Sequence, residues 1–388
     1  MVALKQLDAE ELLNEAKRRT GLSDFGPEDF REGFYLVIDG INKDAHIRDS
    51  GWAPVRERFL RMLMNRLWFA KDLADHPEIL DEQVDAPVFI TSLPRTGSTK
   101  LQRVLGASGG FQTPSYWMGL MFARIPGLED GGRARRIAET REFEKWMYET
   151  SPAMLLGHPM FTDEPEEDLW LLECSFRHPI HSGAFHLPDY GQWLAQTDWM
   201  PAFQYLAAQT KYLHWQLGSQ HDKPWLAKTP SHVGFEPLLC ATNKNPRFIV
   251  THRDPVKCIP SIILTSMAQR GLYSDYDSIS MLGPDLLRMF SAAADAHMQW
   301  RDANPDVEIL DLRFRDVATD GINTVRRVYD FLGLPFTAVA EQGVRKWELD
   351  NPKDKHGRAE YSAATMGTTD EDILQAFSAY RERFASYF

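Results

Sequence analysis

A short apolar run and the turn that follows it constrain the fold of this chain more than any other feature. Residues 87–91 (Pro-Val-Phe-Ile-Thr) are rich in β-forming side chains, which is typical of a buried parallel strand. The turn-forming residues Pro94 and Gly97 come next, and a helix-compatible stretch runs from Ser98 to about Leu105. A strand that passes directly into a helix predicts an α/β sheet whose connecting loop can bind an anion.

Three further runs have the character of buried strands. They cover residues 225–227, 247–252 and 307–312, and helix-compatible segments, including 322–332, fill the intervals. Parallel strands joined by helices form an open sheet with helices on both faces. The sequence therefore predicts an α/β fold with a P-loop-like open parallel sheet flanked by helices.

The regions outside these strands suggest how the chain is organised. Residues from Leu7 to about His76 are helix-like, and residues 1–85 are expected to form an N-terminal helical region packed on the core. Residues 86–388 are expected to form the α/β domain, with a long, aromatic-rich helical insertion at about 113–220. These aromatic side chains are expected mainly to pack the insertion; the alternative is that several line an apolar pocket.

Composition excludes several classes of protein. The 388 residues carry a formal net charge of −12, which argues against a nucleic-acid partner. The cysteines Cys174, Cys240 and Cys258 are far apart, so neither a disulfide framework nor a zinc site is indicated. There is no apolar run of about 18 residues and no signal-peptide pattern, so no membrane span is expected. We expect a cytoplasmic protein of undetermined oligomeric state.

The loop over residues 93–99 has the features of a phosphate site. A junction between strand and helix directs backbone N–H groups and the positive end of the helix dipole at an anion. Gly97 allows the backbone to approach closely, while Ser98 and Thr99 offer hydroxyl donors.

The loop departs from the Walker A pattern GxxxxGK[ST]. Ser92 stands in place of the first glycine and Ser98 in place of the lysine, so that only Thr99 fits the last position. The basic residue is instead Arg95, two positions before the glycine. The loop therefore favours an anion other than a triphosphate.

A second motif follows the strand at 247–252. Arg253 ends that strand and Ser261 falls eight residues later, so together they can bind a phosphate by charge-assisted hydrogen bonds. Asp254 and Pro255 favour a helix start, and Pro260 predicts a late start or a bend. The alternative is that Arg253 simply pairs with the neighbouring Asp254.

A third motif, Lys228-Thr229-Pro230-Ser231-His232, ends another predicted strand. Its alternative interpretation is a surface lysine before an ordinary Thr-Pro turn. All three motifs stand at the carboxyl ends of predicted strands, where open α/β sheets bind their ligands.

Together the motifs resemble those of sulfotransferases that use 3′-phosphoadenosine-5′-phosphosulfate (PAPS). Residues 94–99 resemble the arginine form of the 5′-phosphosulfate loop, found in the bacterial and tyrosylprotein branches; Lys100 departs from the usual apolar residue. Residues 253–261 resemble the 3′-phosphate site, and 228–232 resemble the Lys-[Ser/Thr]-Pro-x-His element of bacterial members. The resemblance spans about residues 87–360.

The resemblance implies transfer of the sulfuryl group of PAPS to an acceptor hydroxyl or amine by in-line displacement, without a metal. Arg95 and Lys228 would contact the leaving phosphate and the sulfuryl group, and Arg253 and Ser261 the 3′-phosphate. The 5′-phosphate would be held by Arg95, Thr96, Gly97, Ser98 and Thr99. The basic residues Lys355, His356 and Arg358 resemble a loop that closes over the nucleotide; the alternative is a solvated tail.

The general base is less clearly marked. Cytosolic relatives use histidine and tyrosylprotein relatives use glutamate, but the corresponding stretch here, 116–118, has no carboxylate. The candidates are His232 and Glu167, the latter within the acidic cluster 163–168. The alternative for the cluster is a helix N-terminus with favourable acidic residues. Less weight falls on three lone histidines, which are more often structural: His158, His181 and His186.

Two other functions remain open: a P-loop kinase that uses ATP and Mg²⁺, and a non-catalytic nucleotide-binding module. The expected partner is a small-molecule acceptor of apolar, aryl or lipid-like character, suggested by the aromatic insertion.

Overall fold

The computed structural model describes residues 6–219, 222–275, 279–352, 355, 357 and 362–388. In these residues the centre of the fold is a parallel sheet of four strands in the order β2-β1-β3-β4. The strands are β1 (Val88–Thr91), β2 (Leu226–Lys228), β3 (Arg247–His252) and β4 (Ile309–Arg313). Each lies within two residues of a predicted strand, so the predicted open parallel sheet is confirmed.

Strand register places the motifs side by side. Val88 of β1 pairs with Leu226 of β2 on one side and with Arg247 of β3 on the other. His252, the last residue of β3, pairs with Arg313 of β4. Because all strands are parallel, the segments that follow β1, β2 and β3 meet at one edge of the sheet.

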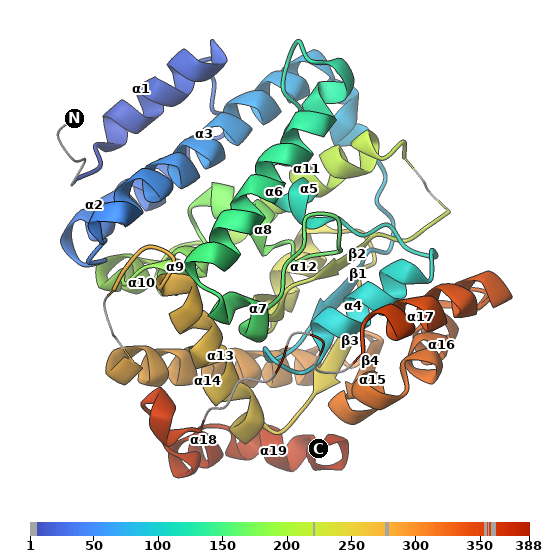
Figure 1. Cartoon of the computed structure of the whole chain (residues 1–388). Helices are drawn as coiled ribbons and strands as arrows, with labels where there is room; N and C mark the ends of the chain where they lie inside the picture. Colours follow the sequence, from blue (N-terminus) through green and yellow to red (C-terminus); the bar gives the residue numbers. More distant parts are fainter. Residues whose placement is uncertain (1–5, 220–221, 276–278, 353–354, 356, 358–361) are drawn as a thin grey trace.

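Helices cover both faces of the sheet, as predicted (Figure 1). One face packs on α4 (Ser98–Ala107), α16 (Gly321–Leu332) and α17 (Ala338–Asp350). The alternation of strand side chains explains this division: Val88 and Ile90 belong to that core, whereas Phe89 belongs to the larger core on the opposite face.

The larger core joins the N-terminal helices to the insertion. The N-terminal helices are α1 (Ala9–Thr20), α2 (Phe30–Lys43) and α3 (Trp52–Asp75). The helices of the insertion are α5 (Tyr116–Leu120), α6 (Arg133–Thr150), α7 (Ala153–Gly157), α8 (Leu169–Leu172), α9 (Ile180–Ala184), α10 (Pro188–Leu194) and α11 (Met200–Gln216). Trp170, Phe176, Phe203 and Tyr212 are buried in this core, so these aromatic residues of the insertion serve packing.

The remaining helices belong to neither of these two groups. They are α12 (Glu236–Thr242), α13 (Pro255–Arg270), α14 (Ile279–Ala303), α15 (Phe314–Thr319), α18 (Asp370–Ala376) and α19 (Ser378–Arg383). The Asp254 side chain caps α13 by accepting a bond from Val256 N. Helix α13 starts at Pro255 and continues through Pro260, so it does not start late.

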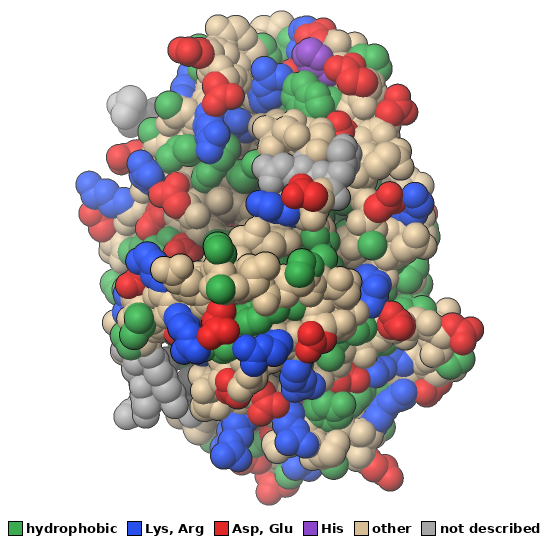
Figure 2. Space-filling model, turned by 90° about the vertical axis from the view of Figure 1, so that its right-hand side faces the viewer, with side chains coloured by type: hydrophobic (Ala, Val, Ile, Leu, Met, Phe, Trp, Pro, Cys, Tyr) green, Lys and Arg blue, Asp and Glu red, His purple; other side chains and the backbone are tan. Residues whose placement is uncertain are grey.

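The surface is that of a folded protein with mixed charge. On the face shown in Figure 2, Lys and Arg side chains are interspersed with Asp and Glu rather than gathered into one basic stripe. Among the helices of the described residues, none is both long and apolar enough to span a bilayer.

Candidate functional site

Three hydroxyl groups brace the loop between β1 and α4. Thr96 is fully buried, and its Oγ1 donates to Leu93 O (2.8 Å) and lies 3.1 Å from Ser92 Oγ and 2.6 Å from Thr251 Oγ1. Thr251 Oγ1 also donates to Ser92 Oγ at 3.0 Å. The Thr96 side chain therefore links the loop to β3. Because the Thr96 hydroxyl is used in these bonds, the backbone N–H of Thr96 is the group that a ligand could contact.

The loop needs two residues with left-handed backbone. Gly97 has φ 89° and forms the N-cap of α4, and an added Cβ there would lie 3.2 Å from the ring of Phe314. Arg95 has φ 66°, which costs a non-glycine residue about 1 kcal/mol. Such a turn before a helix directs successive N–H groups to one side, where an anion can lie.

Lys228 joins β2 to this loop. Its side chain is fully buried, and Nζ donates to Thr99 Oγ1 at 3.2 Å and to Glu167 Oε1 at 2.6 Å. The interpretation of Lys228 as a surface lysine is therefore wrong. A buried ammonium group requires a charged partner, and Glu167 supplies it.

Glu166, which the sequence interpretation missed, completes this cluster. Its carboxylate lies 2.8 Å from His158 Nε2, 3.4 Å from Arg103 and 3.9 Å from Lys228 Nζ. Burial alone would raise the pKa of Glu166, but His158, Lys228 and Arg103 together bring that pKa down to about 2. Its position beside Glu167 in the acidic cluster was the signal available in the sequence.

The same cluster has the composition of a cation site. One ligand atom each from His158, Glu166 and Glu167 lies within 4.8 Å of the others. The Nζ of Lys228 lies 2.6 Å from Glu167 and 3.9 Å from Glu166. The lysine ammonium thus offsets part of the negative charge of Glu166 and Glu167.

The structure places His232 away from the surface. It is fully buried, with Nε2 2.8 Å from Asp168 Oδ2, and its ring packs on Phe89 and Phe203. Burial raises the pKa of Asp168, but the contacts with His232 and Thr229 lower it below its usual value. The acidic cluster therefore divides: Glu166 contacts His158, Glu167 contacts Lys228, and Asp168 contacts His232.

The Arg253 and Ser261 motif meets the same loop from β3. Arg253 donates to Arg95 O at 3.0 Å and lies over the Phe314 ring at 4.2 Å. Arg95 Nε in turn donates to Ser261 Oγ at 3.0 Å. Asp254 does not take up Arg253 but pairs with Arg381 at 3.2 Å.

Other predicted residues lie elsewhere. Lys100 points away from the loop, where it pairs with Glu348 at 2.9 Å. Lys355 donates to Asp350 O and Asn351 Oδ1, both at 3.0 Å. His356 and Arg358 lie outside the described residues, and the contact of this segment with a nucleotide stays a prediction.

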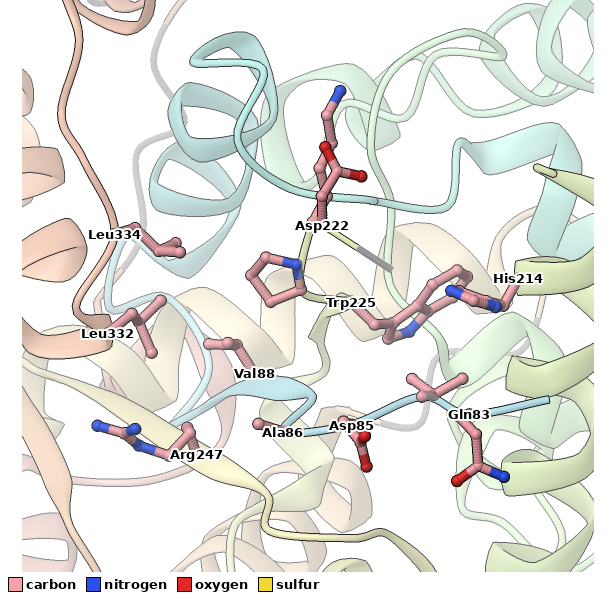
Figure 3. A pocket seen from close by; sticks show the side chains of 13 residues that line it. Gln83, Asp85, Ala86, Val88, His214, Asp222, Trp225, Arg247, Leu332 and Leu334 are labelled. Atoms are coloured by element: carbon pink, nitrogen blue, oxygen red, sulfur yellow. The ribbon is translucent and has the colours of Figure 1, made fainter. Parts of the chain in front are cut away.

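A pocket of about 270 Å³ lies at the opposite, amino edge of the sheet (Figure 3). Leu332 and Leu334 line one side, and Trp225 and His214 line the other. Of the charged groups that line it, Arg247 pairs with Glu308 and His214 with Glu82, at 2.8 and 2.7 Å, and Lys223 also lines the pocket. The pocket lies away from the three strand-end motifs and is therefore a poorer candidate for the anion site.

Comparisons with known proteins show the family to which this chain belongs. A family model described as "Sulfotransferase family" matches residues 87–338. No curated protein sequence matches the chain. Among solved structures, sulfotransferase STF9 from Mycobacterium avium is 23% identical, with a TM-score of 0.85 and coverage of 99% of this chain and 98% of its own.

Sulfotransferase STF1 from Mycobacterium tuberculosis H37Rv is 24% identical, with a TM-score of 0.79 and coverage of 97% of this chain and 99% of its own. These structures share the fold of this chain over nearly its whole length. The family match spans well over half of the sequence and includes the three strand-end motifs. The chain therefore belongs to the sulfotransferase family.

Proposed function

We propose that this sulfotransferase moves the sulfuryl group of PAPS to the hydroxyl or amine of a small apolar, aryl or lipid-like acceptor. The observation that carries the proposal is the meeting of three strand-end motifs around one loop. Lys228 reaches Thr99 from β2, while Arg253 reaches the carbonyl of Arg95 from β3. An adenylate with phosphates at both the 5′ and 3′ positions matches this spread of positive groups.

The backbone turn and the cations support the transfer step. The S–O bond to the 5′-phosphate breaks, the acceptor oxygen or nitrogen forms a new bond to sulfur, and charge develops on the leaving phosphate oxygen. The first N–H groups of α4, with Arg95 and Lys228, stabilise that charge. Arg253 and Ser261 hold the 3′-phosphate and so keep the donor in line.

Glu167 is the better supported base. Its side chain is 11% exposed and contacts Lys228, whereas His232 is enclosed and already bonded to Asp168. When the Lys228 ammonium contacts the leaving oxygen, Glu167 is released from its ion pair. It then accepts the proton that the acceptor loses.

The donor has no β–γ diphosphate to neutralise, and Lys228 already supplies a positive charge to the carboxylates. The proposed mechanism therefore uses no metal. This feature separates it from the alternative of a kinase acting on ATP with Mg²⁺, for which the loop lacks the Walker lysine.

Thermal-shift titration tests the donor, with 3′-phosphoadenosine-5′-phosphate (PAP) compared with ATP plus Mg²⁺. Stabilisation by PAP alone supports the proposal, and stabilisation by ATP with Mg²⁺ alone supports a kinase. A panel of acceptors with [³⁵S]PAPS then tests transfer. Tight PAP binding without transfer to any phenol, sterol, lipid or amine would indicate a non-catalytic module.

A further inference from the structure

The residue before Arg253 is held by the C-terminal segment of the chain. His252 is fully buried, and its Nδ1 lies 2.7 Å from the hydroxyl of Tyr380 at α19. Its Nε2 lies 2.7 Å from Asp311 Oδ1. The imidazole also stacks on Phe384, with ring centroids 4.2 Å apart. Both nitrogens and one face of this ring are therefore occupied.

The hydrogen-bond directions at His252 are determined by its partners. Burial raises the pKa of Asp311, but its bonds to Arg301 (2.8 and 2.7 Å) and to His252 lower that pKa well below the usual range. The carboxylate can only accept, so Nε2 donates to it. Burial lowers the pKa of His252, so the ring is neutral and Nδ1 accepts the proton of Tyr380 Oη.

The residue after Arg253 is held by the same segment. Arg381 donates to both oxygens of Asp254, at 3.2 and 3.3 Å. Asp254 also caps α13. His252 and Asp254 flank Arg253 in sequence. They bond to two consecutive residues of α19: His252 to Tyr380, and Asp254 to Arg381. Figure 1 shows α19 lying beside the end of α13 that carries this turn.

The contact with Arg381 has an electrostatic consequence for an anion at Arg253. Asp254 follows in sequence the arginine that is expected to bind a phosphate, and its negative charge would oppose the binding of an anion there. Arg381 offsets the negative charge of Asp254, and Asp254 still caps α13. Tyr380 fixes the end of β3, from which the Arg253 side chain leaves.

We propose that Tyr380 and Arg381 are positioning residues that set the preference of the donor site for nucleotides with a 3′-phosphate. The proposal rests on the function proposed above, because Arg253 must bind that phosphate. It assigns the C-terminal helix a role in specificity although neither residue belongs to the three strand-end motifs.

The test uses two ligands that differ only in the 3′-phosphate, PAP and adenosine 5′-phosphate. Calorimetry of the full chain gives the ratio of the dissociation constant for adenosine 5′-phosphate to that for PAP, which is large when the site prefers the 3′-phosphate. Arg381→Gln is expected to reduce that ratio about fivefold, the upper end for a partly exposed charge pair, with the affinity for adenosine 5′-phosphate unchanged. The matched control is Arg383→Gln, two residues along α19, which loses a pair with Asp302 instead. The control should keep the wild-type ratio.

Tyr380→Phe tests the second residue, because it removes one hydroxyl and leaves the aromatic packing. A smaller ratio than that of the wild type supports the proposal. A lower melting temperature with an unchanged ratio shows a purely structural role and overturns the assignment of Tyr380, and an unchanged ratio in Arg381→Gln overturns that of Arg381.

The two proposals fail in different ways. A wild-type protein that binds both nucleotides equally overturns the PAPS function and this inference with it. A wild-type protein that strongly prefers PAP, with variants that prefer it equally, overturns this inference alone.

Discussion

The two edges of the parallel sheet differ in how their charged side chains are used. At the amino edge, Arg247 pairs with Glu308 and His214 with Glu82, although a pocket is present. At the carboxyl edge, Arg253 bonds to a neutral carbonyl and lies on a phenyl ring, so its charge is not neutralised by these contacts. The comparison teaches that charge and cavity need not coincide, and we expect the anion at the carboxyl edge, beside the N-terminus of α4, rather than in the pocket.

The largest effect is expected from Lys228→Met. Removing the charge that is proposed to act on the leaving oxygen should lower kcat by about 10²- to 10³-fold, measured with labelled donor. Lys100→Met is the matched control, because Lys100 belongs to α4 but pairs with Glu348. If both variants lose activity equally, the effect at Lys228 does not come from its contact with the loop.

Glu167→Gln tests whether Glu167, at the carboxyl edge, is the general base. We expect kcat to fall about 10²-fold while PAP affinity stays close to that of the wild type. His232→Gln is the contrasting variant, and it should lower the melting temperature more than kcat because His232 bonds to Asp168 inside the core. The opposite pattern would move the role of base to His232.

Arg95→Gly separates the charge from the backbone shape. Glycine accepts the left-handed backbone, so the free energy of unfolding should rise by the strain released, about 1 kcal/mol. Loss of the guanidinium should slow transfer about tenfold. Arg95→Ala is the control, since it loses the same charge without relieving the backbone. A glycine variant less stable than the alanine variant would contradict this account of the loop.

The pH dependence of stability tests the buried cluster. Because the pKa of Glu166 is lowered to about 2, its ionised form stabilises the folded state above about pH 4.5, the value expected when unfolded. That contribution is lost as pH falls from 4.5 towards 2. The melting temperatures of the wild type and Glu166→Gln should therefore converge over this range. A difference that stays constant would contradict the assigned ion pairs.

The smallest effect is expected at the amino edge. Lys223 lines the pocket there, and Lys223→Ala should change kcat/KM by less than about twofold. A large loss of activity would break the comparison, because it would show that the pocket takes part in the reaction.

Local patterns in the sequence predicted the strands and the three motifs, because strand, turn and helix signals lie within a few residues of one another. The partners of Lys228 were less accessible. Glu166 and His158 lie in the insertion, and their approach to β2 depends on packing between segments far apart in sequence. The burial of His232 is likewise a property of the assembled core, as is the bond between His252 and Tyr380.

The hydroxyl groups of Ser92, Thr96 and Thr251 form a small closed ring beneath the phosphate loop. Such a ring keeps the turn in its working shape before any ligand arrives. Little conformational entropy would then be lost in this loop on binding of the proposed nucleotide donor. Any conformational change on binding is consequently expected in the side chains of Arg95 and Lys228 rather than in the backbone of the loop.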